Sequence, residues 1–429
     1  MGHRDRVLRG ISRAPTQLLI SLLIAMVASA SATDVRAEGL KRNVAVVACE
    51  TLAARVDAVP SGSPVFLRSF DAMKDSGPID EPSLATAAFV YDNALATIAL
   101  VACNRAPQAG RIGAALLAAV GPAVNADARL YNAYIAGAVK GAPKPNGWWS
   151  AEQSRWLQDG YQVGTATGNV AWTMLAFLTL SDRTGDVRWC DGARRLAGWT
   201  IKYAHGASDA GGFSGGMYGF EGQQSPLTWK STEHNIDLAA AFAWLSRCDA
   251  SPRWEHYAAE ARAFVSTQWD PSSHHFLIGT TTDGHTPNSA TSALDIQFWA
   301  SLIPNAPPEW RGALAYAERV HGVKNGFSFN SDRDGVWIEG TAQGALAYQV
   351  LGRRGDASRL LENISADFAP TGLLYATRQG QLRTGLAVGP TSVTDDFRYY
   401  HWPHVGATAW AALAAKGWNP FIGAKDGQR

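Results

Sequence analysis

Residues 229–242 read Trp-Lys-Ser-Thr-Glu-His-Asn-Ile-Asp-Leu-Ala-Ala-Ala-Phe, with polar side chains at the start and small or apolar side chains after them. This order predicts a helix that begins at a capping Ser or Thr and is buried on most of its sides. Five similar segments begin near Tyr91, Gly168, Leu294, Glu339 and His404. The six segments recur about every sixty residues, which predicts an internally repeated fold.

Six further stretches have ordinary amphipathic periodicity, with apolar side chains on one helical face. They span residues 44–56, 111–120, 187–203, 254–268, 309–321 and 356–366, and each precedes one of the apolar segments. An outer ring of helices packed around an inner ring requires this alternation. The repeats exceed the length of about 33 to 47 residues that is usual in open solenoids. The sequence therefore predicts an all-α fold, an (α/α)6 toroid of six outer–inner helical hairpins.

The composition is that of a large globular domain. Of the 429 residues, 46% are hydrophobic and 17% are charged, so the chain can bury a large core. Lys and Arg number 38 against 37 Asp and Glu, a balance that argues against nucleic acid as a partner. The 16 Trp, 12 Tyr and 15 Phe exceed the needs of an ordinary core, and aromatic surfaces that stack against sugars are one common use of such residues.

The N-terminus has the pattern of an export signal. Four arginines between residues 4 and 13 precede an apolar run at 18–30, and Val35-Arg36-Ala37 fits a cleavage site. We therefore expect residues 1–37 to be a secretory signal peptide and 38–429 to form a single barrel domain. No later stretch reaches transmembrane length, so we expect a secreted or periplasmic protein without stable membrane insertion after cleavage.

Four cysteines follow the leader, and export permits them to form disulfides in any of three pairings. The hairpin topology distinguishes between these pairings. Cys49 lies near the start of the first outer helix and Cys103 at the end of a helix predicted over 83–103, and Cys190 and Cys248 repeat this placement. The topology thus predicts the pairs Cys49–Cys103 and Cys190–Cys248. No cysteine or histidine spacing of the zinc type is present, and we expect neither a metal nor a cofactor.

The hairpin layout, the acidic residues at the starts of the inner helices and the aromatic loops resemble the six-hairpin glycosidase superfamily. The resemblance extends from residue 44 to residue 418 and does not identify an individual family. It implies an (α/α)6 barrel that hydrolyses glycosidic bonds of a polysaccharide or oligosaccharide, with inversion as in many members. The same toroid also carries sugar epimerases, phosphorylases and polysaccharide lyases, so the fold alone does not determine the reaction.

Glycoside hydrolysis requires one carboxylic acid to protonate the leaving oxygen and a second carboxylate to activate water or attack carbon. The N-termini of the inner helices converge on one mouth of such a barrel. Glu233 and Asp92 are therefore the leading catalytic candidates, and Glu339 is the reserve acid. The alternative for each is a structural role, because a first-turn carboxylate also caps a helix and is favoured by its dipole.

Other polar and aromatic residues at the same mouth are candidates for substrate binding, because flat rings stack on pyranose rings and polar groups fix their hydroxyls. They are Trp149, Asn169, Trp229, His234, Asn235, Asp237, Asp295, Trp337, Gln343, Tyr399, Trp402 and His404.

Two other classes of function remain open. A polysaccharide lyase or sugar epimerase would use His234, His401, His404 or Tyr399 to remove a proton, and an acidic substrate would require a basic cleft. The clustered candidates for such a cleft are Arg378, Arg383 and Arg398. A non-catalytic glycan-binding protein would keep the aromatic residues and tolerate the loss of every carboxylate.

Overall fold

The computed structural model describes residues 38–425 apart from 61, 73–78, 80, 122–126, 128, 207–210, 388 and 391–396. The expected signal peptide at 1–37 lies outside the described residues. Among the helices of the described part, none is long and apolar enough to cross a membrane.

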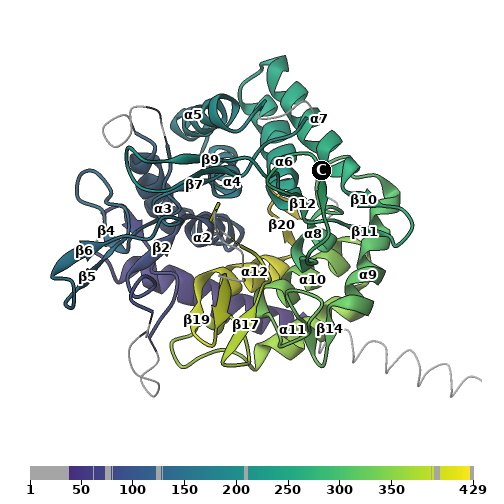
Figure 1. Cartoon of the computed structure of the whole chain (residues 1–429). Coiled ribbons are helices and arrows are strands. Elements are labelled where there is room, and N and C mark those ends of the chain that lie inside the picture. Colours follow the sequence, from purple (N-terminus) through teal and green to yellow (C-terminus); the bar gives the residue numbers. More distant parts are fainter. Residues whose placement is uncertain are drawn as a thin grey trace, which may run out of the picture.

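Twelve α-helices form two concentric rings in the described part of the chain (Figure 1). The inner helices are α2 (Val90–Ala102), α4 (Thr167–Thr184), α6 (Thr232–Cys248), α8 (Leu294–Trp299), α10 (Ile338–Val350) and α12 (Val405–Lys416). The outer helices are residues 38–57, α3 (Ala106–Ala119), α5 (Val187–Tyr203), α7 (Pro252–Thr267), α9 (Gly312–Val320) and α11 (Arg354–Ser365), with the 3-10 turn η1 (Pro308–Arg311) before α9. Each inner helix contacts the next, and α12 contacts α2. The ring is closed, which confirms the (α/α)6 toroid.

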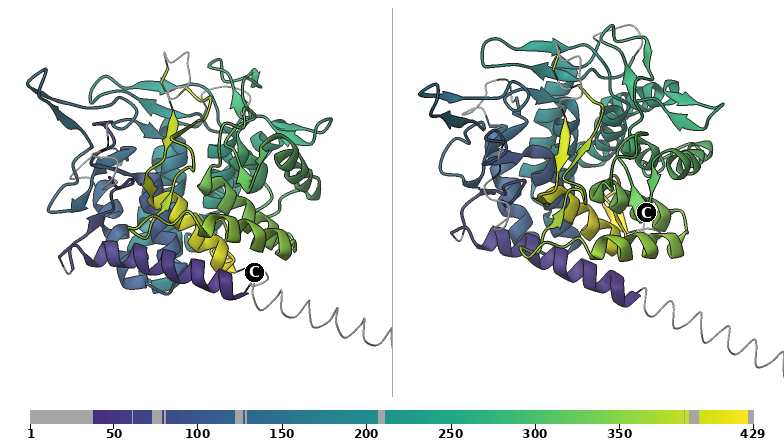
Figure 2. Two further views of the ribbon diagram at one scale, coloured as in Figure 1. Left: turned by 90° about the horizontal axis from the view of Figure 1, so that it is seen from below. Right: turned by 60° about the horizontal axis from the view of Figure 1, so that its bottom comes forward.

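The strands are all two or three residues long and lie in the connections between helices (Figure 2). The described residues form ten small antiparallel sheets. In the first half, β1 (Val65–Phe66) pairs with β4 (Gly137–Ala138), β2 (Ala87–Phe89) with β3 (Ala133–Ile135), and β5 (Trp148–Ser150) with β6 (Arg155–Leu157), while β8 (Gly216–Tyr218) lies between β7 (Thr165–Ala166) and β9 (Ser225–Leu227). In the second half, β10 (Trp269–Asp270) pairs with β11 (His275–Phe276), β12 (Gly279–Thr280) with β13 (Pro287–Asn288), β14 (Gly322–Val323) with β15 (Gly326–Phe327), β16 (Leu374–Tyr375) with β19 (Pro403–His404), β17 (Gln381–Arg383) with β18 (Arg398–Tyr400), and β20 (Trp418–Asn419) with β21 (Ala424–Lys425).

Two helices differ from the sequence-based expectation. The helix predicted over 83–103 begins only at Val90, because the residues before it form strand β2 and pair with β3. Helix α8 has only six residues, and Pro304 follows its end closely. A proline lacks the backbone N–H that a helix needs and its ring collides with the preceding turn. A continuous helix through residue 304 is therefore excluded by the sequence.

A circle of backbone hydrogen bonds joins the six repeats. The first residue of each inner helix donates its N–H to a carbonyl in the segment that precedes the next inner helix, which satisfies one of the unpaired N–H groups of a helix start. The six bonds are Val90 to Asn132 (3.0 Å), Thr167 to Gly215 (3.1 Å), Thr232 to Ile278 (3.0 Å), Leu294 to Phe329 (2.9 Å), Ile338 to Ala376 (3.0 Å) and Val405 to Ser69 (3.0 Å). Because Ser69 precedes α2, the last bond closes the circle.

The fourth residue of five inner helices holds the connection that precedes the same helix. The amide of Asn235 accepts a hydrogen bond from the N–H of Phe213 (2.8 Å) and donates one to the carbonyl of Phe213 (3.0 Å). The others are Asn93 on Leu67, Gln297 on Phe276, Thr341 on Phe327 and Thr408 on Leu374. The equivalent residue of α4 is Val170.

This repeated role corrects the assignment of Asn235 as a substrate-binding residue. Asn235 is fully buried, and its amide also donates to the carbonyl of Ser231 at 2.8 Å. With its hydrogen-bonding capacity used by backbone groups, the side chain orders the start of α6.

A cluster of aromatic rings fills the centre of the inner ring. Trp172 lies edge-on to Trp299 and Trp410, with ring centroids 5.3 Å and 5.7 Å apart, and Trp299 stacks on Trp410 at 5.5 Å. Phe421, from the segment after α12, packs against Trp172 and Trp299. Buried aromatic area of this size is a large contribution to core stability. Two of its members, Trp172 and Trp299, also line the cavity at the N-terminal ends of the inner helices.

Disulfides join Cys49 to Cys103 and Cys190 to Cys248, as the hairpin topology predicts. Cys103 directly follows α2 and Cys248 ends α6. Both bridges thus link an outer helix to an inner helix at the end opposite the starts of the inner helices.

The clamp by the fourth residue can be tested with Asn235→Leu. The substitution leaves the buried N–H and carbonyl of Phe213 without partners, and each such group costs about 1–3 kcal/mol. We expect urea denaturation to give an unfolding free energy lower by about 2–4 kcal/mol. Thr97→Val, which removes one hydroxyl bond to the carbonyl of Asn93 inside a helix, is the control and should cost less than about 1 kcal/mol. Equal stability of Asn235→Leu and the wild type would contradict the clamp.

Candidate active site

A cavity of about 760 Å³ opens at the N-terminal ends of the inner helices. Ten of the predicted site residues line it: Asp92, Asn169, Trp229, Glu233, His234, Asp295, Trp337, Glu339, Tyr399 and His404. The other five do not line it: Trp149, Asn235, Asp237, Gln343 and Trp402. The barrel mouth therefore brings together side chains from all six repeats that are up to about three hundred residues apart in the chain.

Three carboxylates occupy the same helical position. Glu233, Asp295 and Glu339 are the second residues of α6, α8 and α10. Because the six helix starts are aligned by the circle of backbone bonds, equal positions point to the same end of the ring. Asp92 is the third residue of α2, one position later than these three, and it also lines the cavity.

His404 connects two of these carboxylates. Its Nε2 lies 3.2 Å from Asp92 Oδ1, and its Nδ1 lies 3.7 Å from Glu339 Oε2. The same Nδ1 accepts a hydrogen bond of 3.3 Å from the N–H of Ala407, so His404 also caps α12. This bond assigns the proton of the neutral ring to Nε2, which donates it to Asp92. Burial lowers the pKa of His404, but Asp92 and Glu339 outweigh burial and raise it above its usual value.

Glu339 is held by a relay of aromatic donors. The hydroxyl of Tyr91 donates to Glu339 Oε1 at 2.6 Å, and the indole N–H of Trp410 donates to the oxygen of Tyr91 at 2.9 Å. Burial raises the pKa of Glu339 to about 7, against the lowering effects of His404 and of the Tyr91 hydrogen bond. Sequence analysis missed Tyr91. Its position next to Asp92, at the same helical position as the glutamates, is the signal that could have found it.

Glu233 and Asp295 differ in their partners. No described group hydrogen-bonds to Glu233, whose side chain is partly exposed in the cavity. The loss of hydration of Glu233 in the cavity wall, followed by the charges of Asp295 and Glu339, raises its pKa well above the usual value. Burial likewise raises the pKa of Asp295 to about 7, although the N–H of Ile296 donates to Asp295 Oδ1 at 2.7 Å. The cavity thus contains carboxyl groups that keep their protons near neutral pH.

Asp237 and Gln343 lie beneath the cavity wall. Asp237 is one helical turn beyond Glu233, it is fully buried, and neither of its oxygens has a hydrogen-bond partner among the described residues. Burial, and then the charges of Glu233 and Asp295, raise its pKa well above the usual value. Gln343 is one turn beyond Glu339 and donates to Glu339 Oε1 at 3.4 Å. Both side chains can support the carboxylates above them, and neither reaches the cavity.

The aromatic candidates divide by position. Trp229 lies on the rim against His234, with ring centroids 5.6 Å apart, while Trp337 and Tyr399 pack together at 5.3 Å in the opposite wall. Trp402 does not line the cavity, but it packs on Phe70 and Tyr400, which do. Trp149 is 61% exposed on strand β5.

The polar candidates in the second and third repeats have different surroundings. Asn169 donates to Asn132 Oδ1 at 2.8 Å, which fixes its amide beside the cavity. Burial lowers the pKa of His234 to about 4, so this imidazole is neutral at pH 7. A side chain at Gly168 would collide with His234, since a Cβ there would lie 2.5 Å from the ring. The glycine therefore leaves room for the histidine.

The residues proposed for proton removal or for a basic cleft are only partly at the mouth. His401 stacks on Tyr375, with centroids 4.0 Å apart, and does not line the cavity. Arg378 forms an ion pair with Asp367 at 2.7 Å outside the lining, and Arg383 is also outside it. Arg398 does line the cavity. The lining holds six Asp and Glu residues against Lys230 and Arg398, so a basic cleft is not formed by the described residues.

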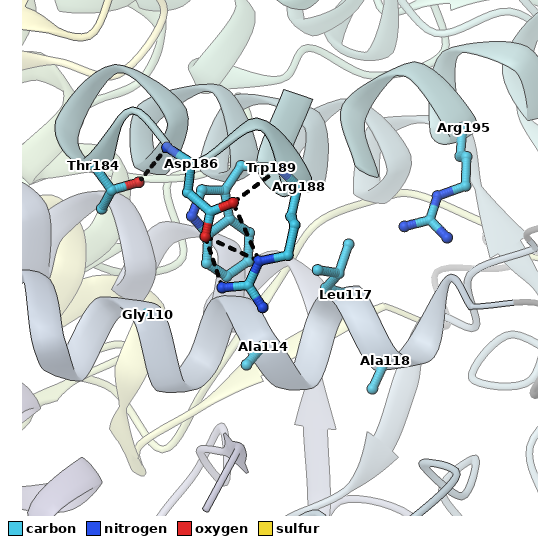
Figure 3. A pocket seen from close by; sticks show the side chains of 9 residues that line it. All are labelled: Gly110, Ala114, Leu117, Ala118, Thr184, Asp186, Arg188, Trp189 and Arg195. Carbon is cyan, nitrogen blue, oxygen red and sulfur yellow. Dashed lines mark hydrogen bonds and ion pairs between the residues drawn. The ribbon is translucent and has the colours of Figure 1, made fainter. Parts of the chain in front are cut away.

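A second hollow, of about 560 Å³, lies on the outside of the toroid between α3 and α5 (Figure 3). Its charged groups are the ion pair of Arg188 with Asp186, at 2.6 Å, and Arg195. Apolar side chains of α3, including Leu117, form its base. This hollow brings no group of carboxylates together, so the cavity at the barrel mouth is the candidate active site.

The chain resembles solved structures of carbohydrate-active enzymes over most of its length. A cellobiose 2-epimerase from Spirochaeta thermophila has 13% identity and a TM-score of 0.59, and the match covers 88% of this chain and 96% of that chain. A variant glycosidase in complex with glucose has 13% identity and a TM-score of 0.58, over 87% and 96% of the two chains. A GH76 α-mannanase from Bacteroides thetaiotaomicron has 11% identity and a TM-score of 0.54, over 87% and 95%.

No protein-family profile matches the sequence, and no curated protein matches it. At 11–13% identity, the likeness to these structures establishes the architecture. The chain has the (α/α)6 toroid fold of these solved structures.

Proposed function

We propose that this protein is a secreted or periplasmic glycoside hydrolase that acts on a neutral oligosaccharide or polysaccharide. One observation carries the proposal. The cavity combines Glu233, a carboxyl group without a described hydrogen-bond partner whose pKa burial raises well above its usual value, with Asp92, whose carboxyl group lies 3.2 Å from His404. A carboxyl group that can donate a proton and a second one that can accept a proton are the two groups that hydrolysis of a glycosidic bond requires.

Glu233 is the proposed general acid. It has no hydrogen-bond partner among the described residues, so its proton can be directed to a bound glycosidic oxygen. The raised pKa favours the protonated form that a general acid needs. As the C–O bond breaks, the proton moves to the leaving oxygen and Glu233 becomes a carboxylate.

Asp92 is the proposed base. Its Oδ1 accepts a hydrogen bond from His404, which fixes the orientation of the carboxylate and leaves the second oxygen free to take a proton from water. The resulting hydroxide attacks the anomeric carbon from the face opposite the leaving group, as in an inverting enzyme. Glu339, tied to Tyr91 and beside His404, is the proposed positioning residue for this pair.

The charge of the lining supports a neutral substrate. Among the described residues of the lining, Lys230 and Arg398 are the Lys and Arg side chains, and they lie in the same lining as Glu81 and Asp159. The lining therefore offers a polyanionic sugar no excess of positive charge, whereas a neutral sugar needs none. Polar groups at the wall can bind its hydroxyls, and rings such as Trp229 can stack on its CH faces.

Epimerisation of a sugar is the second candidate, because His234 presents a neutral imidazole to the same cavity. A neutral histidine can remove a proton next to a carbonyl. Epimerisation releases no reducing ends and incorporates deuterium from solvent next to the anomeric carbon. Hydrolysis releases reducing ends and incorporates no deuterium at that carbon, so product analysis in D₂O separates the two candidates.

Removal of the acid and of the base should have different effects on activity. On natural glycans we expect both Glu233→Gln and Asp92→Asn to lose about 10²- to 10⁴-fold in kcat, measured as reducing-end release. On a glycosyl fluoride, whose leaving group needs no proton, Glu233→Gln should recover most of its activity and Asp92→Asn should not. Glu81→Gln, a carboxylate on the rim, is the control and should retain activity. Recovery of both variants, or of neither, would refute these roles.

Gly406 should be essential for the Asp92–His404–Glu339 group. A Cβ at this position would lie 2.6 Å from Asp92 Oδ1 and 3.0 Å from Glu339 Oε2. We expect Gly406→Ala to displace these side chains and to lower kcat at least about tenfold, since small misplacements of reacting groups are costly. Gly198→Ala, where the added Cβ meets nothing within 4 Å, is the matched control and should be fully active. Full activity of Gly406→Ala would contradict the arrangement.

Stability should decrease as the pH rises through neutrality. The pKa of Asp295 is raised from 3.8 to about 7, so its contribution is present below about pH 4 and is lost as the pH passes 7. The pKa of Glu339, raised from 4.5 to about 7, acts in the same direction. In Asp295→Asn, we expect the loss of unfolding free energy between pH 5 and pH 8 to be smaller than in the wild type by at least about 1 kcal/mol. Denaturation at several pH values measures this difference, and identical slopes would disprove it.

A further inference from the structure

Two tryptophans lie exposed on one hairpin outside the cavity. Strands β5 and β6 pair antiparallel, with Trp149 directly opposite Trp156. Directly opposed residues point to the same face of a hairpin. Trp149 is 61% exposed and Trp156 is 51% exposed, although large aromatic side chains are usually buried. The hairpin projects from the barrel at the mouth end, on the same side as β17 and β18 (Figure 2). We refer to Trp149 and Trp156 as the tryptophan platform.

The ring of Trp156 is supported on one side and open on the other. A Cβ at Gly147 would lie 2.4 Å from Trp156 Nε1 and 2.8 Å from Cε2, so the indole rests against the backbone of this glycine. Half of its surface nevertheless remains accessible. A planar ring that is fixed by its own chain and free on its outer side suits stacking on the CH face of a sugar, with little loss of side-chain freedom.

A buried asparagine ties the base of the hairpin to the cavity wall. The amide of Asn146 donates to the carbonyl of Ser83 at 2.8 Å and to Gln162 Oε1 at 2.6 Å. Asn146 is fully buried, and both Ser83 and Gln162 line the cavity. The platform is therefore held in a defined position relative to the candidate active site.

We propose that the tryptophan platform is a second glycan-binding surface, which holds a distant part of a polysaccharide whose scissile bond lies in the cavity. The proposal rests on the function proposed above and deepens it, because such a surface implies a polymeric substrate. The exposed charges of the hairpin are Glu152 and Arg155, of opposite sign, and they fit an uncharged chain. Neither tryptophan lines the cavity, so a short oligosaccharide that stays within the lining makes no contact with the platform.

Binding and turnover can be measured separately. In the Glu233→Gln background, affinity electrophoresis through gels containing mixed-linkage β-glucan, xylan, galactomannan, dextran or pullulan reports binding without turnover. We expect at least one polysaccharide to retard this variant and Trp149→Ala or Trp156→Ala to weaken retardation about tenfold each. With Glu233 intact, the variant that carries both Trp149→Ala and Trp156→Ala should lose at least about tenfold in kcat/KM on that polysaccharide. On a trisaccharide of the same sugar and linkage it should lose less than about twofold. Phe220→Ala, at a residue 45% exposed, is the aromatic control and should change neither.

Several results would overturn the platform. These are unchanged retardation in both tryptophan variants, no retardation by any of the five polysaccharides, or equal losses on polymer and trisaccharide. Sedimentation velocity adds another, since a dimer that dissociates in the double variant while retardation is unchanged would make this face an interface between copies of the chain. Tryptophan-dependent retardation without turnover of any glycan would refute the hydrolase and leave the platform in place.

Discussion

The structure depends on the circle of six hydrogen bonds in which the first N–H of each inner helix meets a carbonyl of the next repeat. A helix start has unpaired N–H groups, and burying them without partners would be costly. Here they bind the neighbouring repeat, so the same bonds that satisfy the helix starts also set their relative height. The bond from Val405 to Ser69 links the last repeat to the first and makes the ring a closed unit.

The alignment of the helix starts explains both the position of the site and the stability that the protein loses at neutral pH. Side chains one residue beyond the circle face the cavity, and Glu233, Asp295 and Glu339 occupy this position. Side chains at the fourth position turn to the connections and hold them through amide or hydroxyl groups. Bringing several carboxyl groups together in a buried space opposes their ionisation, which lowers stability at neutral pH but supplies a group that can donate a proton.

Much of this could be predicted from the sequence. Periodicity gave the two sets of helices, and the disulfide pairs followed from the hairpins, because both depend on residues close in sequence or on simple topology. The role of Asn235 could not be predicted in this way, since an amide that holds Phe213 looks the same in sequence as one that binds a sugar. Trp149 was expected at the cavity and lies on a projecting hairpin, because strands of three residues leave little periodic signal. Tyr91 became recognisable only when the packing placed its hydroxyl on Glu339.

His404 serves the helix and the cavity with the same ring. Its Nδ1 accepts the bond that caps α12, and its Nε2 contacts Asp92. When the ring takes a second proton, Nδ1 can no longer accept from Ala407 and instead offers a proton towards Glu339. Selection on folding alone would therefore be enough to preserve this histidine. In a descendant that had lost the proposed activity, the histidine would persist. Glu233, which no described group needs as a partner, would be free to change. The identity of residue 233 is thus the better indicator of whether such a descendant still has an active site.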